Sequence, residues 1–389
     1  MQSHTPQSSI LWRQVWGLAA LLAAIIFSWM AYGFYQPRIL EKLGFIGVAS
    51  SLGVLQGLLG ALVEPYVGGI SDRVMRRVGS RLPMITAGVT LAGLIFVAVS
   101  LLIQRELPIP LRWLVPVLMT IWVMAMIVFR GPAIALLIQL APSAELPKAN
   151  TILVFVFGLV GAIGPLISIL IQQLGASLTF MLGALTLVVG ALLLWSTKPQ
   201  YSLSPITENA RPAPTILRSG LIFGVGLGAG LEVNLLLRAF PAMLHLQLPS
   251  VSAEYIASGI LLVSALTAPP FERLTVAIGV KGAMFKSLGA IAGFMGLSLF
   301  VHNSMMAIGL ILVFGVAFGL LFITQIPFAL AMVPPAWAGL GTGLYFGGMG
   351  AATALVSLLE QSGSIAPITG FLGGAIAFLV SIFCLIASK

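Results

Sequence analysis

Long apolar stretches separated by short polar turns make up most of this chain. A helix needs about 20 apolar residues to cross the hydrocarbon core of a bilayer, and twelve stretches approach or exceed this length. They span residues 14–36, 45–69, 84–104, 113–137, 150–172, 178–196, 219–242, 253–271, 284–301, 304–332, 338–358 and 366–387. The pattern therefore predicts an all-α membrane protein with twelve transmembrane helices and no room for a soluble domain.

Two of the polar turns match each other at a separation of 200 positions. Each contains an acidic residue, a basic residue, a glycine and a second basic residue in the same register. The first set is Asp72, Arg73, Gly79 and Arg81, and the second is Glu272, Arg273, Gly279 and Lys281. A polar turn repeated in so apolar a chain indicates two homologous halves, an arrangement typical of secondary transporters.

The repeat divides the chain into two pseudo-symmetric bundles. We predict six helices over residues 1–196, a cytoplasmic linker over 197–217, and six further helices over 218–389. The linker is rich in Ser, Pro and Thr and has no apolar period, which is typical of a loop. We expect it to act as a simple tether between the halves.

Small residues recur at matching positions of the two halves. Phe157-Gly158 with Gly161 in the fifth stretch resembles Phe346-Gly347 with Gly350 in the eleventh. In lipid the hydrophobic effect does not draw helices together, and glycines allow their backbones to approach closely. We expect these glycines to mark helix contacts, with helix bending as the alternative.

Composition excludes several other classes of protein. Hydrophobic residues make up 59% of the chain and charged residues 7%, with a mean hydropathy of +1.11, whereas soluble domains carry about 25% charged residues. The single cysteine, Cys384, excludes an internal disulfide and a thiolate metal cluster. Nucleotide-binding and nucleophile motifs are absent from the sequence, so we expect no cofactor, no metal and no enzymatic activity.

The net charge of +9 reflects membrane topology and does not indicate binding to nucleic acid. With the N-terminus placed in the cytoplasm, thirteen Lys and Arg residues fall in segments on that side and four on the other. Because cytoplasmic loops of membrane proteins are enriched in Lys and Arg, both termini are predicted to be cytoplasmic.

Four charged residues lie within the predicted spans: Glu64, Arg130, Glu232 and Arg238. Each costs about 2.5–3.5 kcal/mol at the centre of a membrane helix. We therefore expect them to face an internal cavity or to pair with one another. Arg238 lies close enough to a span end to extend to the membrane interface.

Glu64 is the main candidate for coupling transport to a cation. It precedes Asp72 by eight residues, about 12 Å of helix, which places it within the hydrocarbon layer. A buried carboxyl group can exchange a proton when no cation holds its charge in place. The alternative is a static ion pair between Glu64 and Arg130, and the two interpretations are compatible because protonation would break such a pair.

Several further residues are candidates for the solute path. Glu232 is a second coupling candidate, and its alternative role is a polar contact that fixes its helix to a neighbour. Arg130, Asn234, Gln325 and Tyr32 are candidate cavity residues, although for Tyr32 and other aromatics packing is the simpler interpretation. The Asp72-Arg73 turn is expected to act in gating, through charge pairs between helices that stabilise one conformation.

The first polar turn, with Gly68 before it, resembles the loop between spans two and three of the major facilitator superfamily. The order Glu64-Pro65, Gly68, Ser71-Asp72-Arg73, Arg77, Gly79, Arg81 and Pro83 is similar to that of the glycoside–pentoside–hexuronide:cation symporters and sucrose-type carriers. This resemblance implies that Glu64 belongs to a cation site. Those sugar symporters usually carry a second acid one turn earlier, where this chain has Gly60, so the resemblance favours a proton over sodium.

The superfamily resemblance implies a monomer that works by alternating access, with spans one, four, seven and ten lining a central cavity. We therefore predict a proton-coupled transporter of a small solute in a prokaryotic inner membrane. The segment 327–355 is similar to the PucC-like family, which keeps open a membrane assembly factor for pigment–protein complexes. An exporter of apolar compounds is a third possibility, because few polar residues are available to line the cavity.

Overall fold

The computed structural model describes residues 9–197, 213–247, 249, 252–301, 303–361, 363 and 367–388. Within these residues, twelve helices are long and apolar enough to cross a membrane. This number confirms the twelve predicted spans. Most of the predicted linker, 197–217, lies outside the described residues, so the proposed division into domains stays a prediction.

The first half of the chain begins with three long helices and a short one. These are α1 (Trp12–Lys42), α2 (Val48–Val78), α3 (Leu82–Leu102) and α4 (Ile109–Arg112). The half continues with α5 (Leu114–Ala135), α6 (Leu137–Leu140), the 3-10 turn η1 (Ser143–Glu145), α7 (Leu146–Ala162) and α8 (Gly164–Ser196).

The second half begins with α9 (Ile216–Asn234), which runs through the π-helix η2 (Leu235–Ala239) into α10 (Phe240–Gln247). The elements that follow are α11 (Ala253–Ile278), α12 (Val280–Leu297), the 3-10 turn η3 (Ser298–Phe300), α13 (Ser304–Ala331), the 3-10 turn η4 (Pro335–Trp337), α14 (Ala338–Gln361) and α15 (Pro367–Ala387).

Several helices extend beyond the apolar stretches that predicted them. α1 ends at Lys42 instead of residue 36, and α2 ends at Val78 instead of residue 69. The apolar pattern marks only the part of a helix within hydrocarbon, whereas the backbone stays helical into the polar interface. The predicted fifth stretch is also interrupted, since α7 ends at Ala162 and α8 starts before Pro165.

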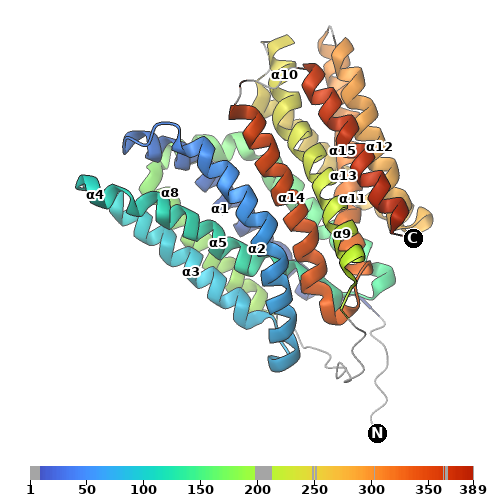
Figure 1. Ribbon diagram of the computed structural model, residues 1–389, viewed down its shortest axis with the longest axis horizontal. Helices are drawn as coiled ribbons and strands as arrows, with labels where there is room; N and C mark the ends of the chain where they lie inside the picture. The colour runs from blue at the N-terminus through green and yellow to red at the C-terminus, as the bar shows by residue number, and fades with distance from the viewer. Residues whose placement is uncertain are drawn as a thin grey trace.

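The two halves lie side by side and meet along α2 and α14. Figure 1 shows α3, α4 and α8 on one side of the molecule and α12, α13 and α15 on the other, with α2 and α14 adjacent between them. Buried apolar side chains form two clusters, one drawn mainly from α1 to α8 and one mainly from α9 to α15.

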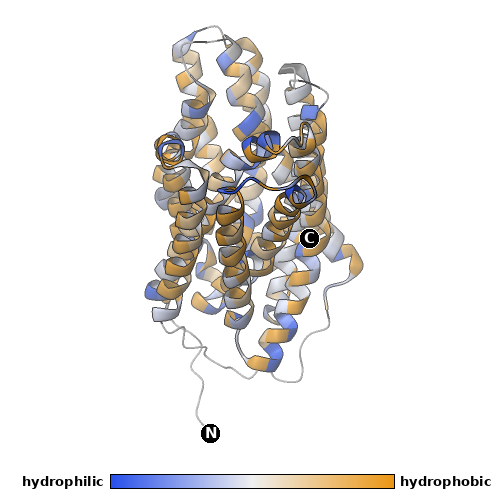
Figure 2. Ribbon diagram, turned by 90° about the vertical axis from the view of Figure 1, so that its left-hand side faces the viewer, coloured by the Kyte–Doolittle hydropathy of each residue, from blue (hydrophilic) through white to orange (hydrophobic). Residues whose placement is uncertain are grey.

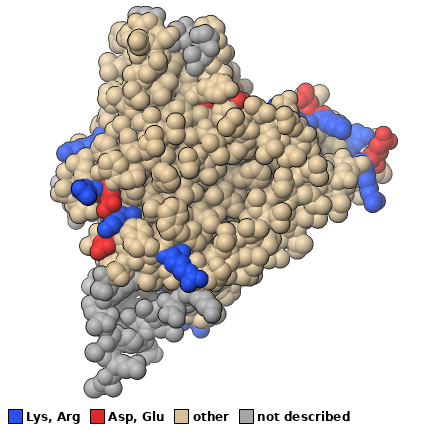
Figure 3. All heavy atoms as spheres, turned by 180° about the vertical axis from the view of Figure 1, so that it is seen from behind, with Lys and Arg blue, Asp and Glu red and all other residues tan. Residues whose placement is uncertain are grey.

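The outer surface of the bundle is suited to lipid. Figure 2 shows apolar residues along most of the helix length and hydrophilic residues concentrated near helix ends. Large apolar side chains such as Leu62, Leu379 and Phe383 are exposed. Figure 3 shows a broad uncharged area between charged side chains that lie near the edges of that face. Apolar residues therefore cover much of the outside of the bundle, as a membrane protein requires.

The two ends of the bundle can be distinguished by the helices that begin and end there. α1 begins where α8 ends, since a side chain on Gly17 would lie 2.8 Å from Thr197. α2 ends beside the start of α14, where Arg76 donates a hydrogen bond of 3.2 Å to the carbonyl of Ala336. We call this end of the bundle the terminal side, and the opposite end the far side.

Glycines allow α9 and α14 to pack with their backbones in contact. A Cβ atom on Gly226 would lie 2.1 Å from the carbonyl oxygen of Tyr345. We predict that Gly226→Ala lowers stability by about 1–3 kcal/mol, because the rigid backbone of α14 must move to admit the methyl group. Thermal unfolding of the detergent-purified protein measures this loss.

Gly220→Ala on the same helix is the matched control, because a Cβ atom there meets no atom within 4 Å. Alanine is a better helix former than glycine, so this variant should keep or raise the unfolding temperature. Equal effects of the two substitutions would show that close backbone contact at Gly226 is not what limits stability.

Candidate functional site

A cavity of about 530 Å³ lies between the two halves. The four spans expected to line it, α1, α5, α9 with η2, and α13, all contribute side chains, and α2, α7 and α14 complete the walls. Most lining residues are apolar, aromatic or glycine. The polar and charged ones are Gln56, Glu64, Arg130, Asn150, Arg238, Gln325, Thr353 and Ser357.

An ion pair between Glu64 and Arg130 lies in the wall of this cavity. Arg130 on α5 donates from Nη2 to Oε1 of Glu64 on α2. The guanidinium carbon of Arg130 also lies 5.2 Å from the centroid of the Phe346 ring on α14, a cation–π distance. The pair predicted across spans two and four is therefore present, and it reaches a helix of the second half.

The backbone around Glu64 packs directly against α14. A Cβ atom on Gly343 would lie 2.4 Å from the carbonyl oxygen of Glu64, and one on Gly347 would lie 3.0 Å from the Pro65 ring. Gly350 approaches the backbone of Ala61 in the same way, at 2.9 Å. A shift of the backbone at Glu64 therefore requires α14 to move as well.

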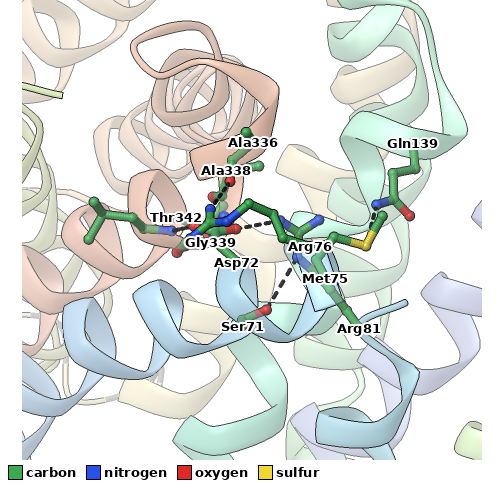
Figure 4. Close-up of polar contacts among 11 residues, drawn as sticks. Ser71, Asp72, Met75, Arg76, Arg81, Gln139, Ala336, Ala338, Gly339 and Thr342 are labelled. Carbon is green, nitrogen blue, oxygen red and sulfur yellow. Dashed lines mark hydrogen bonds and ion pairs between the residues drawn. The ribbon is translucent and has the colours of Figure 1, made fainter. Parts of the chain in front are cut away.

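Asp72 closes the terminal side of this contact. Its Oδ1 accepts a hydrogen bond from the backbone N–H of Gly339, and its Oδ2 accepts one from Leu340, both at 2.8 Å (Figure 4). These N–H groups belong to the first turn of α14, where they have no partner within their own helix. The carboxylate of one half therefore caps a helix of the other, with favourable helix-dipole electrostatics.

Arg81 holds this carboxylate in place. Its Nη2 lies 2.5 Å from Oδ1 of Asp72, and its Nε donates to the hydroxyl of Ser71 at 3.2 Å (Figure 4). Arg81 and Asp72 are both buried. Gly68 allows the close approach, because a Cβ atom there would lie 2.1 Å from the carbonyl oxygen of Gly339.

The two copies of the turn share a positive φ at the glycine, but ψ is 6° at Gly79 and 153° at Gly279, and their contacts also differ. Gly79 and Gly279 have φ angles of 75° and 77°, a left-handed region that favours glycine, which explains why both copies carry it. Lys281, the counterpart of Arg81, donates a 2.7 Å hydrogen bond to the carbonyl of Ser388. Arg73, Arg273 and Glu272 have no hydrogen bond or ion pair to another described residue, and both arginines are exposed.

Three predicted site residues do not line the cavity, whereas Gln325 does. Tyr32 is buried within the first half, where its ring stacks on Trp122 at 4.6 Å and its hydroxyl accepts a hydrogen bond from Gln56. Asn234 donates to the carbonyl of Gly230 at 2.8 Å and to the hydroxyl of Thr353 at 3.3 Å. Their contacts are those of packing residues, because α1 and α9 turn these side chains toward neighbouring helices.

Glu232 is the third residue absent from the cavity wall. It is 1% exposed, and neither carboxylate oxygen has a hydrogen-bond partner among the described residues. Glu232 is buried, as its place within a predicted span indicates. Its side chain does not line the cavity as expected, and the neighbouring Val233 does. A role for Glu232 in coupling stays a prediction.

Asn150 is a site residue that the sequence analysis missed. From α7 it donates hydrogen bonds of 2.9 Å to the carbonyls of Phe322 and Ile323 on α13. It joins the two halves in the wall of the cavity, near the start of α7. The sequence did contain a signal for this role, because Asn150 is an amide residue at the start of an apolar span.

The family assignment comes from a comparison with known proteins. The family model described as Major Facilitator Superfamily matches residues 18–357 of this chain. The chain belongs to the major facilitator superfamily. The carrier branch and the PucC-like family suggested by shorter motifs stay predictions.

The fold of this superfamily member is also similar to a solved structure. The crystal structure of the human organic anion transporter MFSD10 (TETRAN) matches with a TM-score of 0.72 and 15% sequence identity, covering 96% of this chain and 99% of that one. At this identity the match shows a shared fold. A comparison with curated protein sequences gives no match.

The contact between Asp72 and α14 predicts how a variant of this superfamily member will behave. Asp72→Ala removes the two charge-assisted hydrogen bonds to α14, worth about 1.5–3 kcal/mol each, together with the ion pair to Arg81. We expect at least a tenfold rise in conformations that are open on the terminal side. Distances between spin labels at Arg77 and Pro335, in a Cys384→Ala background, report this opening.

Arg73→Ala is the matched control, because Arg73 adjoins Asp72 but is exposed. Its distance distribution should match that of the parent protein. If the distance distribution of Asp72→Ala also matches that of the parent protein, Asp72 does not hold the two halves together on the terminal side.

Proposed function

We propose that this chain is a secondary active transporter that moves a small polar or amphiphilic solute by alternating access, coupled to a proton. The observation that carries the proposal is the Glu64–Arg130 ion pair in the wall of a cavity between the two halves. A titratable pair at that place can respond both to a proton and to the solute.

The cavity supports one half of an alternating-access cycle. α2 lines it from Gly53 to Glu64, and α14 lines it from Phe346 to Ser357, so its walls run from the middle of the bundle toward the far side. On the terminal side, Asp72 and Asn150 bridge the halves. Opening of that side requires these bridges to separate.

Protonation of Glu64 provides the coupling step. Arg130 is the charged side chain in contact with Glu64, and the facing backbone of α14 contributes no charge there. Addition of a proton to Glu64 removes half of the ion pair and weakens the link between α2, α5 and α14. We prefer a proton to sodium, because Gly60 stands where related sugar symporters carry a second acid.

The cavity lining limits the kinds of solute that fit. Trp29, Phe157 and Phe322 offer apolar surface, while Gln325 and Thr353 supply a few hydrogen-bonding groups. This mixture suits a solute with both apolar and polar parts. It also supports a second candidate, an exporter of apolar compounds, for which the apolar lining is the favouring observation.

The membrane setting is part of the proposal. We place the terminal side in the cytoplasm of a prokaryotic cell, following the distribution of Lys and Arg in the sequence, and we propose that the transporter acts as a monomer.

Glu64→Gln is the direct test of the coupling role. Glutamine is similar in size and stays neutral, so the variant should lose accumulation driven by a pH gradient while retaining solute exchange. The measurement is uptake and counterflow in proteoliposomes, with a solute first selected by thermal-shift screening of sugars, amino acids and pigments.

Glu41→Gln is the matched control, because Glu41 is exposed near the end of α1. It should accumulate solute like the parent protein. Full accumulation by Glu64→Gln would rule out the coupling role, and the absence of any solute movement by the parent would favour an assembly factor.

A further inference from the structure

The charged residues that line the cavity have a positive excess. They are Glu64, Arg130 and Arg238. Glu360 pairs with Arg238 at 2.6 Å, but it does not contribute to the cavity wall. Once Glu64 is neutral, both remaining charges in the lining are positive, and this charge favours an anionic solute.

Arg130 has hydrogen-bond donors to spare. A guanidinium group carries five N–H donors in a planar fork, and among the described residues Arg130 has a single acceptor, Oε1 of Glu64. Its Nε is buried without a hydrogen-bond partner among the described residues. The free edge of such a fork matches the two oxygens of a carboxylate.

The exposure of the two partners shows which one a solute can reach. The side chain of Arg130 is 26% exposed, whereas that of Glu64 is 3% exposed. A solute entering the cavity therefore meets the guanidinium before the carboxylate. An anionic solute and Glu64 would compete for the same positive group.

A π-helix places Arg238 on the cavity wall. Residues five apart in a regular α-helix lie about 140° apart around its axis, so Val233 and Arg238 would then face different directions. In a π-helix the i→i+5 hydrogen bonds bring such residues close to one face. η2 spans Leu235–Ala239, and both Val233 and Arg238 line the cavity.

The two arginines are too far apart to hold one small solute together. Arg130 lies against Phe346 and Arg238 pairs with Glu360, fourteen residues later on α14. That separation corresponds to about 21 Å of helix. Arg238, which is 41% exposed at the far side, can attract an anion toward the entrance, and Arg130 can hold it deeper inside.

Aromatic side chains beside Arg130 suit an apolar solute body. Trp29, Phe157, Phe322 and Phe346 come from four helices and line the same cavity. Aromatic rings give large contact areas and can stack on a flat or extended apolar group. A carboxylate attached to such a group would satisfy both the guanidinium and the rings.

We propose that the cavity binds a small amphiphilic carboxylate, with Arg130 as the anchoring residue and Glu64 as its internal competitor. The proposal rests on the proposed transport function and adds the substrate class and the role of Arg130. Protonation of Glu64 would then release Arg130 for the solute, so the proton and the anion would bind together.

The experiment compares three probes with one carbon skeleton: 4-phenylbutanoate, 4-phenylbutylamine and 4-phenylbutanol. Binding to the purified full chain is measured by isothermal titration calorimetry. We expect the carboxylate to bind more tightly than the amine and the alcohol. Glu64→Gln should tighten carboxylate binding by about tenfold or more, since a charge-assisted hydrogen bond no longer competes.

The double variant Glu64→Gln with Arg130→Gln removes the buried pair together, so neither charge is left without its partner. It should lose the preference for the carboxylate, while its affinity for the alcohol stays near that of Glu64→Gln. Arg238→Gln alone should reduce the carboxylate preference only modestly, because Arg238 lies at the entrance.

Three results would overturn the substrate class: preference for the amine, a retained carboxylate preference in the double variant, or no binding of any probe. Failure of the proposed function is seen separately, in proteoliposomes. Binding of 4-phenylbutanoate through Arg130 without its transport would leave the anion site standing and would overturn the carrier.

Discussion

The backbone contact between α2 and α14 is the constraint on which the rest of the structure depends. Helices in lipid gain no hydrophobic driving force from association, so close packing and polar contacts must hold them together. Gly68, Gly343 and Gly347 allow the two backbones to touch, and Asp72 caps the first turn of α14 at one end of the contact. The same contact joins the halves and forms one wall of the cavity.

The position of Glu64 within this contact links its chemistry to the conformation of the whole bundle. Breaking a buried ion pair costs about 3–5 kcal/mol, whereas moving a two-state equilibrium from 1:99 to 99:1 requires about 5.5 kcal/mol. Loss of the Glu64–Arg130 pair alone therefore falls short of a complete switch. In the proposed cycle, the contact of Asp72 with α14 and the binding of solute contribute the remainder.

Much of the fold follows from features that are local in the sequence. Span number depends on the length of apolar stretches, and the repeated glycines at 79 and 279 reflect a local backbone requirement. The pairing of Glu64 with Arg130 could also be anticipated, because two opposite charges in hydrocarbon have few alternatives. Helix ends were predicted less well, since hydropathy does not record helix that continues into the polar interface.

The direction of individual side chains could not be read from the sequence. Glu232 and Val233 are neighbours, yet only Val233 lines the cavity. Arg238 reaches the cavity wall because of a π-helix, a local change in helix geometry that no residue pattern predicted. Asn150 and Tyr32 show the same limit, because their roles depend on which helix of the bundle lies opposite.

The central claim is that solute and proton move together through Glu64. The most direct test is proton movement into proteoliposomes that contain the purified chain, driven by a solute gradient with no initial pH gradient. The account predicts that protons follow the solute in the parent protein and that Glu64→Gln moves solute without protons. Solute movement by the parent protein with no accompanying protons would contradict it.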